Sequence, residues 1–231
     1  MSAPTSAGVL AEMTALLVQD REITDVVSRL TQECLRVLPV DAAAILVSEQ
    51  STGLQLLTAT SHTATQLELY QAMHDSGPCV DTIEQGVAVS AVGEDEIVGR
   101  WPEVGAAVVA AGFLSVHAIP LAWRGDAIGG LNLFGRNPHA WSEEDRSVAH
   151  SLADLATVAI ARPGLGETSA VHARIREALE VRVRIEQAKG VLAQTERLDM
   201  DAAYDALVER AATRSLGEVA DAVLRAAQRR A

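Results

Sequence analysis

The chain has 231 residues, a formal net charge of −12 and 48% hydrophobic residues. This apolar content is typical of folded proteins and excludes a wholly disordered chain. The length suits one large domain or two small ones. No apolar run approaches the roughly 20 residues of a membrane span. The N-terminus lacks the basic and apolar regions of a signal peptide. We therefore expect a cytoplasmic protein without a membrane partner.

The charge is distributed unevenly along the chain. Residues 1–170 contain 8 Lys and Arg residues against 21 Asp and Glu residues, whereas residues 171–231 contain 11 against 10. An acidic chain is, taken as a whole, a poor binder of nucleic acid. Because more than half of the cations lie in the last quarter, any contact with a polyanion is expected there.

Residue patterns in the first part of the chain alternate between extended and helical. Two β-hairpins are predicted from apolar runs that flank glycine-containing turns, at 42–48 with 54–60 and at 115–122 with 127–134. Helical spacing is found at 9–17, 23–35 and 64–74, and from Ser142 to about Ala161. A further short helix is predicted after the Gly77-Pro78 break and ends at Gln85. Ser142 and Asp145 resemble a capping box. These elements predict an α+β domain with an antiparallel sheet and segregated helices.

Proline and glycine interrupt the helical pattern between Ala161 and Ser169. Only helices are predicted beyond this break, over about 170–194, from Asp199 or Asp201, and from Ser215. Ser215 to Glu218 form a capping box. Three helices in about 60 residues bury little core, so such a unit usually needs a partner or a dimer. The first of these helices could also continue the 142–161 helix as a dimer stalk.

The strongest cluster of chemical groups is in the first C-terminal helix. Arg182 and Lys189 are seven residues apart and share a face within about 20°, with Glu186 between them. A ladder of exposed ion pairs is the plain alternative interpretation, worth only a few tenths of a kcal/mol per pair. Gly190 inside a helix costs about 1 kcal/mol relative to alanine, so we expect another backbone or a ligand to approach it closely.

These residues resemble a known family. The segment Glu186-Gln-Ala-Lys-Gly190, within the pattern from Leu179 to Leu192, resembles the core of the ANTAR domain, a three-helix RNA-binding module of bacterial antiterminators. The resemblance continues through Ala203, Leu207, Ala211, Leu216 and Ala220. It implies that two copies in a homodimer bind paired RNA stem-loops with hexanucleotide loops. Holding that RNA fold would prevent an overlapping terminator hairpin from forming.

Several side chains suit contact with unstacked loop bases and phosphates. The expected RNA-binding residues are Arg182, Gln187 and Lys189, with Gly190 for close approach and with Arg184, Arg214 and Ser215 as weaker candidates. Arg184 points about 160° away from Arg182. Arg214 and Ser215 begin the third helix, whose N-terminus suits a phosphate, although plain capping is the favoured role of Ser215. Tyr204 could stack on a base, but core packing is favoured.

The N-terminal part resembles a GAF domain of the kind that precedes ANTAR domains in actinobacterial proteins. The resemblance rests on Ser76 to Gly86, Arg100 to Pro102, Ser115 to Leu121, Ile128 to Leu133 and Trp141 to Asp145. It implies a sensor and dimerisation domain over residues 5–162, a linker over 163–169 and an ANTAR domain over 170–231. A small-molecule ligand or a signalling partner at the GAF domain is implied without its identity.

Other chemistry finds less support in the sequence. Cys79, His74 and His117 lack the spacing of metal ligands, no paired acid and base is evident, and we expect no cofactor and no enzyme activity. Cys79 is expected to be a small buried hydrophobe rather than a redox switch. Two alternatives stay open: a signalling module whose C-terminal helices dock a protein, and an enzyme similar to free methionine sulfoxide reductase using Cys34 and Cys79.

Overall fold

The computed structural model describes residues 5–19, 21–161, 168–211 and 214–229. The strands are β1 (Ala42–Glu49), β2 (Gly53–Ala59), β3 (Val89–Val92), β4 (Ser115–Trp123) and β5 (Asp126–Gly135). The helices before the break are α1 (Ser6–Val18), α2 (Ile23–Val37), α3 (His62–His74), α4 (Pro78–Gln85), α5 (Glu94–Arg100), α6 (Pro102–Ala110) and α7 (Glu143–Ala161). The helices after it are α8 (Thr168–Glu196), α9 (Met200–Arg210) and α10 (Leu216–Gln228).

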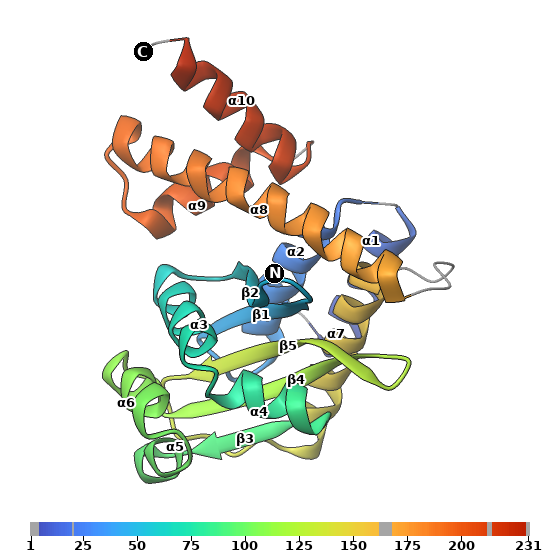
Figure 1. The fold of residues 1–231 in the computed structure, drawn as a ribbon, viewed down its shortest axis with the longest axis vertical. Helices are drawn as coiled ribbons and strands as arrows, with labels where there is room; N and C mark the ends of the chain where they lie inside the picture. Colours follow the sequence, from blue (N-terminus) through green and yellow to red (C-terminus); the bar gives the residue numbers. More distant parts are fainter. Residues whose placement is uncertain (1–4, 20, 162–167, 212–213, 230–231) are drawn as a thin grey trace.

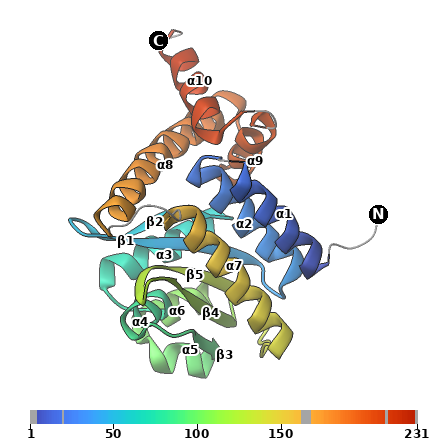
Figure 2. The same ribbon diagram turned by 90° about the vertical axis from the view of Figure 1, so that its right-hand side faces the viewer.

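The strands form one antiparallel sheet in the order β2-β1-β5-β4-β3. The two predicted hairpins, β1–β2 and β4–β5, are joined by the pairing of β1 with β5. Helices α1, α2 and α7 cover one face of the sheet, and α3 to α6 lie on the other side (Figures 1 and 2). The predicted α+β fold, an antiparallel sheet with flanking helices, is therefore confirmed.

Both faces of the sheet are buried, which explains the continuous apolar sequence of β1. Successive side chains of a strand point to opposite faces. Ile45 therefore joins the cluster formed with α2 and α7, whereas Leu46 joins the cluster that contains Cys79 of α4. On β5, a Cβ atom at Gly130 would lie 2.7 Å from the Cys79 sulfur. The glycine lets α4 approach the sheet closely.

Capping residues set where several helices begin. Ser142 and Asp145 bond each other's backbone N–H groups at the start of α7, as the sequence predicts. Asp199 begins α9, because its carboxylate accepts a hydrogen bond of 2.8 Å from the Ala202 N–H. Ser215 and Glu218 form the predicted capping box of α10. These caps satisfy N–H groups that have no partner inside the helix.

The sequence patterns did not predict the short elements β3, α5 and α6. At lengths of 4, 7 and 9 residues, an element contains too few turns or alternations for periodicity to identify it. Trp101 lies between α5 and α6, is 3% exposed, and donates its indole N–H to Asp81 at 3.0 Å. Trp101 therefore anchors the start of α6 to α4.

The last three helices form a small bundle of their own, with Leu192, Leu207 and Val219 in its core. The expected continuous stalk is wrong, because α8 turns across the sheet domain instead of extending α7 (Figures 1 and 2). The apolar stripe at the start of α8 causes this arrangement. Val171 and Ile175 are fully buried in the same cluster as Ile160 of α7. Residues 163–167 of the predicted 163–169 linker lie outside the described residues.

Candidate nucleic-acid interface

Helix α8 carries most of the residues predicted to contact RNA, and its sides have different surroundings. Ile185, Ala188 and Leu192 pack in the core of the bundle. A second side contains Arg182, Glu186 and Lys189, and we call it the cationic face. A third side, which we call the open face, consists of Val183, Gln187, Gly190 and Gln194, all exposed to solvent. The helical period of 100° per residue separates these sides.

The cationic face points toward the sheet domain. Lys189 is only 5% exposed, and its ammonium lies 2.9 Å from Glu186 Oε2 and 5.7 Å from the centre of the Tyr204 ring. Burial lowers the pKa of the Arg182 guanidinium. The predicted sharing of one side by Arg182 and Lys189 is confirmed. The Lys189 ammonium is buried and its Glu186 partner is only partly exposed, so the pair differs from the exposed ladder of the alternative interpretation.

A narrow cavity of about 20 Å³ separates the cationic face from the sheet domain. Arg182, Glu186, Lys189 and Tyr204 line one side, and Ser28 and Thr58 are on the other. This volume is close to the roughly 10–15 Å³ that a single water requires. A nucleotide base is much larger, so in this arrangement RNA does not reach Lys189.

Gln187 and Gly190 lie on the open face, turned away from the sheet domain. A Cβ atom at Gly190 would have no neighbour within 4 Å. Packing inside the chain therefore gives no reason for a glycine at this position, although the residue weakens the helix. The contacts of the described residues do not explain Gly190, so the close approach of another molecule stays the predicted reason for it.

The weaker candidates are engaged in contacts inside the bundle. Arg184 pairs with Asp221 of α10 at 3.2 Å and so braces α8 against α10. Arg214 is exposed and lies 3.5 Å from Glu218. The Ser215 hydroxyl accepts a hydrogen bond of 3.1 Å from the Glu218 N–H, which is its capping role. Of the two arginines, Arg214 has the side chain that is more exposed to solvent.

Hydrogen bonds between the bundle and the sheet domain were not predicted from the sequence. The Tyr204 hydroxyl lies 2.5 Å from the Ser28 hydroxyl of α2. The Asp201 carboxylate accepts a hydrogen bond of 2.7 Å from the His62 N–H at the start of α3. The signal available in the sequence was the tyrosine hydroxyl itself, which needs a partner when buried.

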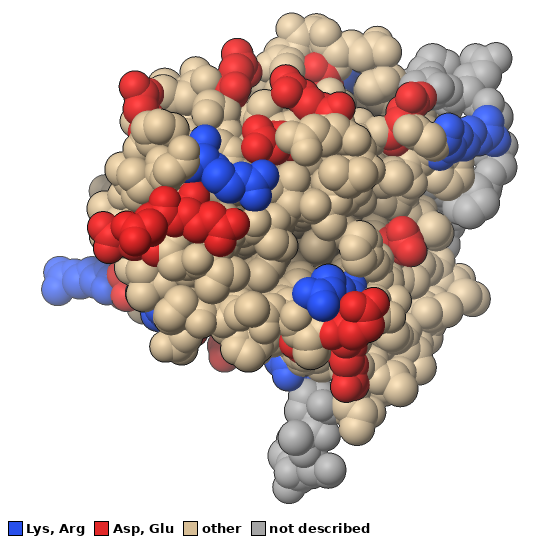
Figure 3. Space-filling view, turned by 90° about the horizontal axis from the view of Figure 1, so that it is seen from below, with Lys and Arg blue, Asp and Glu red and all other residues tan. Residues whose placement is uncertain are grey.

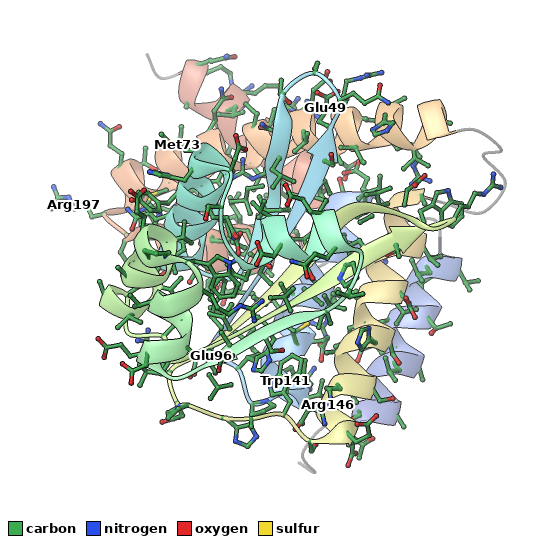
Figure 4. All side chains as sticks on the ribbon, turned by 60° about the horizontal axis from the view of Figure 1, so that its bottom comes forward. Glu49, Met73, Glu96, Trp141, Arg146 and Arg197 are labelled. Carbon is green, nitrogen blue, oxygen red and sulfur yellow. The ribbon has the colours of Figure 1, made fainter. Side chains whose placement is uncertain are left out.

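Further contacts between the two parts involve carboxylates. Asp25 of α2 accepts a hydrogen bond of 2.8 Å from the Leu216 N–H, at the first turn of α10. Burial raises the pKa of Asp25, and this bond opposes the shift. Glu49 lies at the end of the β1–β2 hairpin next to α8, and Arg176 approaches it to 3.6 Å (Figure 4). The bundle is therefore held to the sheet domain along α2, α3 and the β1–β2 hairpin.

Family models agree with this division of the chain. The model of the GAF domain matches residues 20–161, and the model of the ANTAR domain matches residues 173–224. The chain belongs to the GAF family and carries a C-terminal ANTAR domain. This pairing is that of a regulator that couples a sensory domain to an RNA-binding output domain. No match was found among curated protein sequences.

Solved structures show the same GAF fold. The GAF domain of a phosphoenolpyruvate-protein phosphotransferase from Coxiella burnetii is 16% identical with a TM-score of 0.56, covering 77% of this chain and 99% of that one. The phycoerythrobilin-bound GAF domain of a cyanobacterial phytochrome is 17% identical with a TM-score of 0.54, covering 72% and 100%. The reduced fRMsr of Staphylococcus aureus is 12% identical with a TM-score of 0.52, covering 69% and 99%. At these identities the likeness concerns the fold alone.

A polar cluster lies inside the GAF domain, between α3 and the sheet. Glu68 is fully buried and accepts hydrogen bonds from the side-chain amides of Gln71 and Asn132. Burial raises the pKa of Glu68 to about 8. The carboxyl group is therefore largely protonated at neutral pH, which avoids an unpaired charge inside the domain.

Neither cysteine has the surroundings of a reactive thiol. Cys34 and Cys79 are both fully buried, in separate clusters of the GAF domain. Burial is the main cause that raises the pKa of both thiols. A buried thiol of raised pKa is a poor nucleophile. Within the described parts of the chain, no cluster of three His, Cys, Asp or Glu residues is suited to hold a metal ion.

One face of the GAF domain carries more acidic than basic side chains. This face lies opposite the ANTAR domain and has wide uncharged areas between the charged groups (Figure 3). Such a surface repels a polyanion. No helix among the described residues is both long and apolar enough to cross a membrane.

Proposed function

We propose that the protein is a transcription antitermination regulator that binds paired stem-loops with hexanucleotide loops in nascent RNA. The proposed sensor domain comprises residues 5–162, the linker 163–169 and the RNA-binding domain 170–231. The protein acts as a cytoplasmic homodimer whose two ANTAR domains hold the two stem-loops. The GAF domain senses a small molecule or a signalling partner, and the chain catalyses no reaction.

The observation that carries this proposal is the ANTAR match over residues 173–224, together with the chemistry of α8 inside it. Arg182 and Lys189 supply cations on one side, while Gln187 and the open backbone at Gly190 lie on the adjacent side. Cations, an amide and an accessible helix suit unstacked bases and the phosphates next to them. Arg214 adds a charge at the start of α10.

The test is the affinity of the full chain for an RNA with two hairpins and six-base loops. Replacing Lys189 by alanine is expected to weaken binding by roughly 1–3 kcal/mol, as for the loss of a good base contact. Arg225→Ala is the matched control, because Arg225 is an exposed cation on α10 outside the proposed contact set. Both variants lose one positive charge, so a general charge effect would weaken them equally.

Equal binding by Lys189→Ala and the parent would remove the assignment of this face to RNA. Tight capture of a protein, without selectivity among RNAs, would favour the signalling module that docks a protein partner. Circular dichroism of each variant checks that the helices are intact.

A further inference from the structure

One surface of the GAF domain covers the residues proposed to bind RNA. This surface, which we call the α2–β2 surface, consists of Asp25 and Ser28 of α2 with Leu57, Thr58 and Ala59 of β2. It faces Arg182, Lys189 and Tyr204 across the cavity of about 20 Å³. Lys189 retains 5% of its exposure, so the strongest RNA candidate is shielded by the chain itself.

The contact at α10 has the chemistry of a phosphate site. The first N–H groups of a helix and the positive end of its dipole attract anions. The Leu216 N–H donates to the Asp25 carboxylate at 2.8 Å. The Glu22 carboxylate lies 3.0 Å from the position of a Cβ atom on Gly217. Two acidic side chains of the GAF domain thus lie where a phosphate would approach the helix start.

The ring of Tyr204 is held in the same contact. Its hydroxyl bonds with Ser28, and its face is turned toward the Lys189 ammonium. Stacking of a base on this ring would require both neighbours to move. The cation, the aromatic ring and the helix start are therefore all covered by one surface.

We propose that the α2–β2 surface competes with RNA for the ANTAR domain, with Asp25 occupying the place of a phosphate, so that the structure represents a closed form. RNA binds only after the ANTAR helices leave this surface. The inference rests on the proposed function, since it assigns to the GAF domain control over the same RNA-binding residues.

The anchoring of α8 determines what must move. Val171, Ile175 and Ala178 belong to the core of the GAF domain, whereas Ile185 belongs to the core of the ANTAR bundle. Opening therefore bends α8 between Ala178 and Ile185 or withdraws its first half from the GAF core. Each of these movements costs free energy, and this cost stabilises the closed form in the absence of RNA.

The experiment compares the full chain with Asp25→Ala, with the double variant Asp25→Ala/Ser28→Ala and with Asp95→Ala. Asp95 is exposed on α5, away from the ANTAR domain, so its variant is a control of equal charge change. Affinity is measured for the RNA with two six-base hairpins. Amide hydrogen exchange of peptides containing Tyr204 and Leu216 reports opening without RNA.

We expect faster exchange and about tenfold tighter RNA binding in the Asp25 variants. The loss of a hydrogen bond to a charged acceptor should change the equilibrium between the closed and open forms by about that factor. Asp95→Ala should match the parent.

Faster exchange with RNA affinity at the parent level would overturn the inference and leave the proposed function standing, because RNA would then bind on the open face. Unchanged exchange and affinity in the double variant would also overturn it, since these contacts would not hold the closed form. Faster exchange with no binding of hairpin RNA by any form would instead refute the proposed function.

Discussion

Replacing Gly190 by alanine is expected to stabilise the protein while weakening its binding to RNA. A Cβ atom at this position has no neighbour within 4 Å, so no clash opposes the better helix propensity of alanine. The gain is about 1 kcal/mol for a helix interior, which corresponds to a rise of about 2–4 °C in Tm for a chain of this size. The same methyl group would obstruct a ligand that approaches the backbone of α8, at a cost of about 1 kcal/mol or more in binding.

Thermal unfolding and the affinity for the RNA with two hairpins are the two measurements. Gly99→Ala is the matched control, because Gly99 lies in α5 and also has no neighbour within 4 Å of its Cβ position. This variant should gain stability and keep the RNA affinity of the parent. A lower Tm for Gly190→Ala would show a contact within the protein that the structure does not contain. An unchanged RNA affinity would show that RNA does not approach Gly190.

Two further predictions concern the interior of the GAF domain and the start of α10. Because burial raises the pKa of Glu68 to about 8 from the ordinary 4.5, the folded form holds a proton that the unfolded form releases. Stability should therefore fall as the pH rises from about 4.5 to about 8, and Glu68→Gln should flatten this decline in urea unfolding, whereas a parallel profile would refute the assignment. Ser215→Ala should lose about 1 kcal/mol of stability with the loss of the cap, and leave RNA affinity unchanged. Weaker RNA binding at unchanged stability would instead assign the hydroxyl to a phosphate.

The parts of the fold that the sequence predicted are those specified by neighbouring residues. Gly53 begins β2 directly after the turn of the first hairpin, Gly125 is in the turn of the second, and both have the positive φ that favours glycine. Ser142 and Ser215 identify helix starts through bonds to residues three positions away. The elements between 87 and 113 escaped prediction because each is short. The continuous stalk was wrong because the apolar stripe at Val171 and Ile175 indicates burial without saying against which element.

The candidate site was predictable only on the side that α8 itself determines. The helical period predicts that Arg182 and Lys189 share a face, and the structure agrees. What covers that face lies far away in the chain. Ser28 is 176 residues from Tyr204, and Asp25 is 191 residues from Leu216. Polar contacts of this kind have no periodicity or local motif, so sequence patterns alone did not reveal them.

The most direct measurement is sequencing of the transcripts that copurify with the full chain and with Lys189→Ala. RNA bound to the parent should be enriched in paired hairpins with six-base loops, located ahead of a terminator, and this enrichment should disappear in the variant. An identical transcript population for the two proteins, or one without such hairpins, would contradict the role of the ANTAR helices as a reader of nascent RNA.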